Sequence, residues 1–229
     1  MQPWFLWKGI DSRTMGVWVS ELPPPTRATE RTEEVEVPGR PGKLTIKEGD
    51  NVHDGYVREC RITVPANADF ASLLTWLTGD GDAVFSNEAD RAYKAHLAAE
   101  VKFTKISNSL KTATLAFYVH PHKAQYPPEP AISVSTSASI YNPGTVEAKP
   151  LIKLTGSGAD ITLTVNSTAY TYDDVTGPIY IDCDAQIITE SGAIWDGAYD
   201  AEFPTLQTGA NTVAISGGTC EITPRWRWI

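Results

Sequence analysis

The chain has 229 residues, of which 41% are hydrophobic and 21% charged, a composition typical of a folded globular protein and not of a disordered one. Its formal net charge of -9 gives the wrong sign of field for non-specific phosphate binding, which argues against nucleic acid as a specific partner. No apolar run approaches the roughly 20 residues that span a bilayer, and the start, MQPWFLWKGIDSR, lacks the pattern of a secretory signal. We therefore expect synthesis in the cytoplasm and no membrane partner.

Short alternating runs in the first half predict β-strands, at 4–8, 16–20, 33–37, 43–47 and 59–64. The run RAYKAHLAAEVKF keeps apolar side chains on one parity from Tyr93 to Phe103, and LKTATLAFYVH alternates again from Ala113 to Val119. With a turn at 107–109 between them, the two runs predict a long antiparallel hairpin.

One segment, ANADFASLLTWLTG, has a helical period instead. Its apolar residues recur at i, i+3, i+4 and i+7 and predict one buried helix face: Phe70, Leu73, Leu74 and Leu77. Asn67 or Asp69 can accept hydrogen bonds from the free amides of the first turn, and Gly79 can take the left-handed closing position. We expect one short helix packed on a sheet.

Three prolines in KAQYPPEP predict a semi-rigid linker that no strand crosses, because proline lacks the amide that a sheet ladder needs. This places an N-terminal domain at 1–122, a linker at 123–130 and a C-terminal domain at 131–229.

The second half is more uniformly β. GADITLTVNSTAYTYDD alternates, turns at AsnSer and alternates again, and GPIYIDCDAQI, NTVAISGG and CEITPRWRWI supply further strands. Short strands at this spacing indicate a sandwich or jelly roll. The predicted fold is mainly β, with two domains: an N-terminal β-sandwich carrying one short helix and a C-terminal β-sandwich.

A search for chemistry yields no catalytic, cofactor or metal residue. The nucleophile elbow, the zinc HExxH, the P-loop and the dinucleotide fingerprint are all missing from the sequence. His120 and His122 flank Pro121 but have no third metal ligand nearby, so we read them as ordinary histidines before the linker. Asp80 and Asp82 lack the later bidentate glutamate of a calcium loop, which favours a plain turn.

Other polar or reactive residues receive structural interpretations. Asp182 and Asp184 share one strand face and could form a carboxylate pair, but alternation with apolar neighbours favours solvated acids. The sequon at 166–168 reads as a hairpin turn. The cysteines lie without CxxC spacing, which favours buried free thiols: Cys60, Cys183 and Cys220.

The last residues, ITPRWRWI, alternate tryptophan and arginine. Exposed tryptophans would suit a nucleic-acid platform. We expect instead a closing strand, in which Trp226 and Trp228 fill the second core while Arg225 and Arg227 face outward toward carboxylates of this acidic chain.

Several motifs resemble, in their order, the distal tail proteins of long-tailed phages and prophages. In the first half these are WFLWKGIDS, ELPPPTRATE, VPGRPGKL, WLTGDG, FSNEADRAYKAHL and FYVHP, and in the second half YNPGTVEAKPLIKLTGSGADITLTVN, EFPTLQTGANTVAISGG and ITPRWRWI. The resemblance covers nearly the whole chain. The second domain carries no long insertion, as in the short form of that family.

The resemblance implies a virion structural protein and no enzyme. It implies a homo-hexameric baseplate hub, as one ring or two, that joins the tail tube protein to a tail tip or tail-associated lysin protein. N-terminal domains would form the ring wall and galectin-like C-terminal domains would project outward. Assembly would take place in the bacterial cytoplasm and the final location would be the tail tip. DNA would pass through the ring without specific binding, and we hypothesise that the charge of -9 per copy makes the channel acidic.

Two surfaces are candidates for binding. Residues 22–40 are rich in proline and charge, and form either a solvated loop or an arm that clasps a neighbouring subunit. The candidate subunit contacts there are Arg27, Arg31, Glu33, Glu34 and Arg40. The alternative function is a carbohydrate-binding module for host cell-wall adsorption, with Trp195, Asp196 and Tyr199 as sugar contacts and Asp200 nearby. A wall hydrolase would need a convergent acid pair that the sequence does not show.

Overall fold

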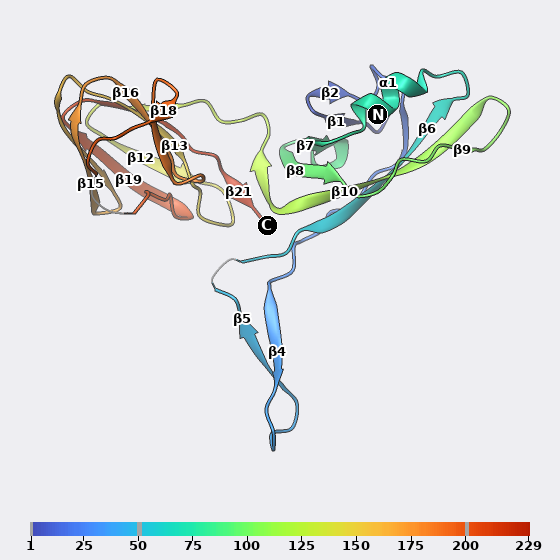
Figure 1. The fold of residues 1–229 in the computed structure, drawn as a ribbon, viewed down its shortest axis with the longest axis horizontal. Coiled ribbons are helices and arrows are strands. Elements are labelled where there is room, and N and C mark those ends of the chain that lie inside the picture. Colours follow the sequence, from blue (N-terminus) through green and yellow to red (C-terminus); the bar gives the residue numbers. More distant parts are fainter. Residues whose placement is uncertain (1, 50–51, 200–201) are drawn as a thin grey trace. The chain divides into compact units, whose positions relative to one another are not determined.

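The computed structural model describes residues 2–49, 52–199 and 202–229, and almost all of its regular elements are β-strands (Figure 1). The chain divides after Tyr126 into two compact units. One α-helix occurs among the described residues, which confirms the predicted mainly β fold. Within those ranges, no helix has the length and apolar character needed to cross a membrane.

The first unit is built on an antiparallel sheet with the strand order β2-β1-β7-β8-β10-β6-β3, and β9 also pairs with β10. The strands of this sheet are β1 (Phe5–Trp7), β2 (Ile10–Asp11), β3 (Trp18–Glu21), β6 (Tyr56–Pro65), β7 (Asp80–Phe85), β8 (Arg91–Leu97), β9 (Thr104–Lys105) and β10 (Leu110–Gln125). A short 3-10 turn, η1 (Ser86–Glu88), links β7 to β8, while β4 (Thr32–Glu36) and β5 (Lys43–Lys47) form a separate two-stranded sheet.

The predicted long hairpin is present, but its first strand is shorter than expected. β8 pairs with β10, and the alternating side chains of β10 from Ala113 to Val119 are buried as predicted. The prediction that the first strand reaches Phe103 is wrong, because β8 ends at Leu97. The chain leaves the sheet there and brings the Phe103 ring to 5.0 Å from the ring of Phe70, so packing on the helix overrides the alternating pattern.

The helix α1 (Phe70–Trp76) begins as predicted. Asp69 is its N-cap and accepts hydrogen bonds from the amides of the first turn, and Gly79 follows with a φ of +66°. The predicted buried face is partly wrong: Leu74 is exposed and Trp76 is buried. The indole nitrogen of Trp76 donates to the Trp7 carbonyl, and that of Trp7 donates to the Trp76 carbonyl, both at 3.1 Å, which turns Trp76 toward β1.

The second unit is a sandwich of two antiparallel sheets around one core. One sheet has the order β11-β20-β13-β16-β17-β18 and the other β12-β19-β14-β15. The strands of the two sheets are β11 (Ile132–Val134), β12 (Ser137–Asn142), β13 (Leu151–Thr155), β14 (Ala159–Val165), β15 (Thr168–Val175), β16 (Pro178–Asp182), β17 (Ile187–Glu190), β18 (Ala193–Ile194), β19 (Gly209–Ser216) and β20 (Thr219–Thr223), and the short β21 (Arg227–Trp228) belongs to neither sheet. The side chains predicted to face inward from β14, Ile161, Leu163 and Val165, all lie in that core.

Part of the predicted linker belongs to a β-strand, contrary to expectation. The sequence predicted that no strand enters 123–130, yet β10 continues to Gln125, where Lys123 pairs with Tyr93. The ladder between β10 and β8 shifts register between Val119 and Lys123, and Pro121 falls within that irregularity. A proline at a bulge removes no regular ladder bond, so the strand resumes beyond it.

The C-terminal stretch is interrupted and is not a single closing strand. β20 ends at Thr223, and Arg225 has a φ of +56°, which breaks the extended backbone before the short β21. Trp226 is nevertheless buried in the core of the second unit, with Trp228 packed against that core. The predicted role is therefore confirmed for Trp226, whereas Trp228 is half-buried at the edge of the core, and the prediction of one continuous strand was wrong.

Candidate assembly surface

The β4–β5 hairpin is a two-stranded ribbon of its own (Figure 1). The motif VPGRPGKL forms its end, where Gly39 and Gly42 have φ values of +81° and +79°, a backbone region that glycine enters without strain. At its other end Glu30 bridges to His53, and the Arg31 amide donates to the Val52 carbonyl. We call residues 30–48 the arm and residues 22–29 the arm root.

The strand register gives the arm two chemically different faces. The pairs Glu33↔Ile46 and Val35↔Leu44 alternate with Thr32↔Lys47, Glu34↔Thr45 and Glu36↔Lys43. Since side chains of one strand alternate between faces, Val35, Leu44 and Ile46 share one face, and charged residues and threonines cover the other. Leu44 is 38% exposed and Ile46 45% exposed. The arm is thus an amphipathic ribbon whose apolar face is open to solvent.

The charged face forms ion pairs within the arm. Glu34 binds Lys43 at 3.0 Å and Glu30 binds Lys47 at 2.6 Å. The bond from Lys47 holds the pKa of the Glu30 carboxyl below its usual range. All these groups remain largely exposed, so they contribute little to stability.

The five charged residues that the sequence suggested for subunit contacts all lie on the arm or its root. Arg31 pairs with Asp54 at 2.8 Å at the base of the arm, and Arg40 lies in the turn at its end. Arg27 is exposed in the root, and Glu33 and Glu34 lie on opposite faces. The sequence analysis missed the apolar face of the arm. Its signal was present, since Val35 and Val37, and likewise Leu44 and Ile46, are apolar residues two positions apart with polar residues between or beside them.

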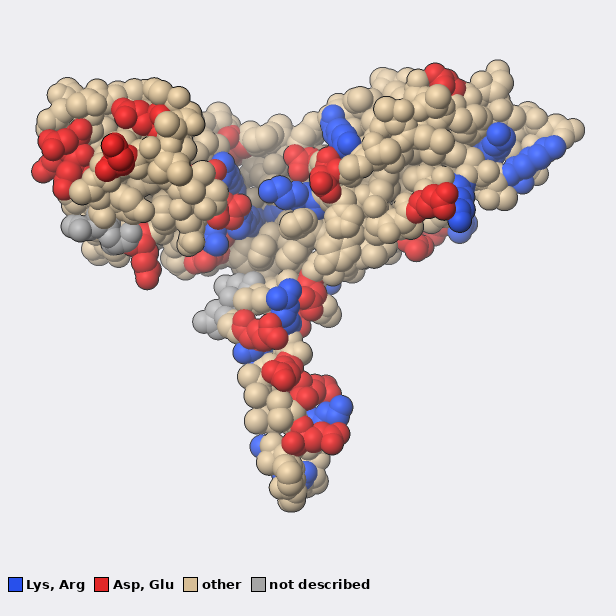
Figure 2. Space-filling model, in the orientation of Figure 1, with Lys and Arg blue, Asp and Glu red and all other residues tan. Residues whose placement is uncertain are grey.

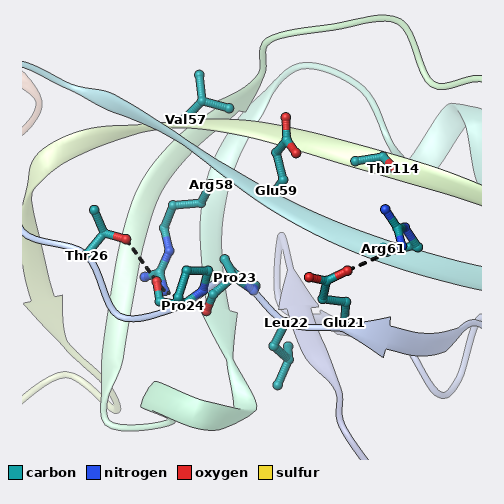
Figure 3. Close-up of a pocket in the computed structure, with 10 residues that line it drawn as sticks. All are labelled: Glu21, Leu22, Pro23, Pro24, Thr26, Val57, Arg58, Glu59, Arg61 and Thr114. Carbon is teal, nitrogen blue, oxygen red and sulfur yellow. Dashed lines mark hydrogen bonds and ion pairs between the residues drawn. The ribbon is translucent and has the colours of Figure 1, made fainter.

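The arm root is held by buried polar side chains (Figure 3). Arg58 on β6 donates from Nη2 to the Pro23 and Pro24 carbonyls at 3.2 and 3.1 Å. The Glu88 carboxylate accepts from Arg58 and from the Tyr93 hydroxyl at 2.7 Å each, and from Lys123 at 3.1 Å. Burial acts to raise the pKa of Glu88, but these hydrogen bonds and the Arg58 charge outweigh it, and the pKa lies below its usual value. We call these four side chains the Arg58 cluster.

The aromatic residues proposed as sugar contacts belong to one group in the second unit. Tyr199 stacks on buried Tyr172 with centroids 6.4 Å apart, and Trp195 lies at 6.3 Å from Tyr172. Trp195 packs against the core, while Tyr199 is 46% exposed and Asp196 is exposed. Asp200 lies outside the described residues. The arrangement therefore presents Tyr199 to solvent and uses Trp195 largely for packing.

The interpretation of Asp182 and Asp184 as solvated acids was only partly right, because Asp184 is exposed whereas Asp182 is half-buried, and both form ion pairs. Arg225 binds Asp182 at 2.7 Å and Arg227 binds Asp184 at 2.8 Å. The hydrogen bond from Arg225 lowers the pKa of Asp182 below its usual value. The arginines of ITPRWRWI thus meet carboxylates, as predicted, and hold the C-terminal segment against β16.

The cysteine thiols are buried and chemically quiet. Cys60 lies in the first core, and Cys183 and Cys220 lie in the second. Burial raises the pKa of each thiol to about 12, so the reactive thiolate is scarce at neutral pH. In the part of the chain that the structure describes, no three histidine, cysteine or acidic side chains gather in a group that could hold a metal ion.

The charge of the chain is unevenly divided. Residues 1–126 contain 16 acidic and 15 basic side chains, and residues 127–229 contain 12 acidic and 4 basic ones. The first unit is thus close to neutral, and both acidic and basic side chains lie along the arm (Figure 2). The hypothesis of an acidic channel rested on the charge of the whole chain. That charge lies almost entirely in the second unit, which the resemblance places outside the ring wall.

Comparison with known proteins finds a likeness in structure alone. No protein-family model matches the chain, and no curated protein matches its sequence. Among solved structures, SPP1 Dit (gp 19.1) matches with a TM-score of 0.75 over 100% of both chains, at 16% identity. That protein is described as a paradigm of the hub adsorption apparatus in phages that infect Gram-positive bacteria. The chain has the fold of this phage hub protein along its whole length.

Proposed function

We propose that the chain is the distal tail hub of a long-tailed phage or prophage. The observation that carries this proposal is the structural match to SPP1 Dit, because it covers both units and leaves no part of either chain unmatched. The order of motifs along the sequence supports it independently. The role is structural, with no catalytic group, and its location is the tail tip of the virion.

The proposed assembly is a homo-hexamer, as one ring or two, that joins the tail tube protein to a tail tip or tail-associated lysin protein. The first unit forms the ring wall and the second, galectin-like unit faces outward. The near-neutral charge of residues 1–126 suits this division, since like-charged ring subunits would repel one another.

The arm is the proposed contact with the neighbouring copy. An isolated two-stranded hairpin is at best marginally stable in water, and the arm also exposes Leu44 and Ile46 on its apolar face. Covering that face on a second copy would remove apolar surface from water and stabilise the hairpin. Arg27, Arg31, Glu33, Glu34 and Arg40 then lie around the contact, where their charges set its orientation.

The test is the mass of the purified particle, measured by light scattering and accompanied by electron microscopy. We expect a six-fold ring with a central hole, and a stable monomer at high concentration would contradict the proposal. Leu44→Thr with Ile46→Thr should shift the mass toward the monomer. The matched control, Lys43→Gln with Glu34→Gln on the opposite face, should leave the mass unchanged.

Carbohydrate binding by the second unit is the second candidate function, favoured by the exposed ring of Tyr199 beside Asp196. Binding of a host cell-wall polysaccharide that Tyr199→Ala abolishes would support it. Tyr180→Ala is the control, because Tyr180 is similarly exposed, at 40%, and lies on another strand. Equal loss with both variants would argue against a site at Tyr199.

A further inference from the structure

The chain has to leave the first sheet before it can form the arm. β3 ends at Glu21 and β4 begins at Thr32, and three consecutive prolines, Pro23 to Pro25, follow soon after β3. Proline has no amide hydrogen, so this segment cannot continue to pair with β6 as β3 does. Among the described residues, positions 56–60 of β6 pair with β10 on one side and with no strand on the other.

Side chains take over where the backbone ladder stops. Arg58 donates to the Pro23 and Pro24 carbonyls, Asn87 donates to the Pro23 carbonyl at 2.8 Å, and the Tyr56 hydroxyl donates to the Thr26 carbonyl at 3.1 Å. Figure 3 shows the Arg58 side chain reaching from β6 to Pro24. These three side chains therefore bind the arm root at the carbonyl groups of Pro23, Pro24 and Thr26.

A cavity of about 300 Å³ separates part of the root from the sheet edge. Leu22, Pro23 and Pro24 of the root line it together with Glu21 at the end of β3, and Val57 to Glu59 line it on β6. Packing holds other parts of the root, because Leu22 lies against the first core and Pro23 and Ala28 are buried. Beside the cavity, where the root stands away from the edge, hydrogen bonds that cross from the sheet add to this packing.

Arg58 is well suited to hold such a segment rigidly. Its side chain is 1% exposed, and its guanidinium lies 4.3 Å from the Tyr93 ring centroid and 4.9 Å from that of Phe85. Its Nε and Nη1 atoms are buried and have no hydrogen-bond partner in the described residues, so the aromatic rings are their neighbours. Only Nη2 forms hydrogen bonds, and it directs them to Glu88 and the root.

We propose that Arg58 is a positioning residue for the arm: the Arg58 cluster fixes the direction in which the arm leaves the sheet, and so presents its apolar face to a second copy. This rests on the proposed function for the identity of the partner. A buried ion pair is weak evidence of stabilisation, because proteins with apolar replacements of such pairs are often as stable. The direction of the root, in contrast, depends on the hydrogen-bond donors that bind its carbonyl groups. Holding the root also lowers the entropy that the arm loses on docking.

The test uses hydrogen exchange of the full chain, followed by mass spectrometry. Arg58→Met with Glu88→Gln removes the Arg58 donor without leaving Glu88 as an unpaired buried charge, and it keeps the Asn87 and Tyr56 donors. We expect exchange in peptides covering 26–34 to become about tenfold faster, because the Arg31 amide loses the fixed geometry of its hydrogen bond to the Val52 carbonyl. Peptides covering 110–119 on β10 should keep their protection.

Two milder variants guard against a general loss of folding. Asn87→Ala and Tyr56→Phe each remove one donor to the root and should give smaller increases confined to the same peptides. Unchanged exchange at 26–34 in all three variants would overturn the proposal, and so would equal loss of protection on β10, which would mean that Arg58 only supports the core.

Particle mass separates this proposal from the proposed function. If the Leu44→Thr, Ile46→Thr variant assembles normally while the Arg58 variant loosens peptides 26–34, the assembly role of the arm fails and the positioning role stands. If the arm is needed for assembly but Arg58 does not affect exchange at the root, the positioning role alone fails.

Discussion

The two units of the chain reach stability by different routes. The second closes its core between two sheets, and its most buried polar side chains bond to nearby backbone: Asn142 to the Val146 and Leu206 carbonyls, and Asn211 to Gln207. The first combines one sheet and a helix with a buried ion cluster, and extends an arm whose apolar face is uncovered. The core of the second unit is closed between its own sheets, whereas the first unit leaves apolar side chains of the arm exposed, which the proposed contact between copies would cover.

The charges follow the same division. A neutral first unit with mixed charges can approach copies of itself, and an acidic second unit tends to keep its copies apart and solvated. The net charge of a whole chain therefore says little about any one of its surfaces.

Core truncations should have the largest effects and should show whether the units unfold separately. Phe117, fully buried beside Phe5, Trp7 and Phe85, belongs to the first core, and Trp226 belongs to the second. We expect Phe117→Ala and Trp226→Ala each to lower the free energy of unfolding of its own unit by about 3–5 kcal/mol, because each leaves a large cavity. Urea denaturation measures the effect.

The buried thiols report which unit has opened. In Phe117→Ala, Cys60 should react with a thiol reagent at a lower urea concentration than in the unchanged chain. In Trp226→Ala, the same shift should occur for Cys183 and Cys220. If either variant exposed all three thiols together, the two units would form one cooperative structure and the comparison would fail.

Much of the second unit could be predicted from its sequence, because its strands obey local rules. The inward side chains of β14 and the turn into β15 follow directly from alternation and turn chemistry. The motif EFPTLQTGAN also has a partly local explanation, because the side-chain oxygen of Asn211 accepts a hydrogen bond from the Gln207 amide four positions earlier. Such a motif marks a structural turn that needs particular residues.

The first unit was harder to predict because distant residues decide its details. Trp76 faces inward through reciprocal bonds with Trp7, 69 positions away, and no helical period contains that information. The same holds for the candidate site. Sequence located the arm through its charge and proline content, but the Arg58 cluster joins β6, η1, β8 and β10 and has no signature along the chain.

A smaller effect is expected where the C-terminal segment meets β16. Asp182→Asn removes the ion pair with Arg225 but keeps an acceptor for the backbone, and should cost the second unit about 1 kcal/mol at pH 7, because both partners are partly exposed. The pKa of Asp182 is lower in the folded state than in the unfolded one. Its contribution is therefore present above about pH 4 and is lost as the pH falls below that value.

Urea denaturation at pH 7 and pH 3 tests this sign. The difference between Asp182→Asn and the unchanged chain should shrink at pH 3. A difference that grew in acid would mean that Asp182 is stabilised in its protonated form.

The helix cap should matter to a similar or slightly smaller extent, and in the first unit only. Asp69→Ala removes the acceptor for the Ala71 and Ser72 amides and should cost about 1 kcal/mol, while Asp69→Asn, which can still cap, should cost less. Denaturation followed by Cys60 labelling measures this. Equal losses for both variants would assign the effect to the charge of Asp69 and not to capping.

The smallest effect is expected on the charged face of the arm. Glu34→Gln removes an ion pair whose side chains are 58% and 52% exposed, and should change the free energy of unfolding by no more than about 0.5 kcal/mol. Particle mass should also stay constant, since this face points away from Leu44 and Ile46.

Light scattering at low and high salt is the measurement, because a contact made by exposed charges weakens as salt rises. A salt-dependent loss of mass in Glu34→Gln would place the contact on the charged side, as the charged residues of the sequence first suggested. The apolar face would then need a different partner.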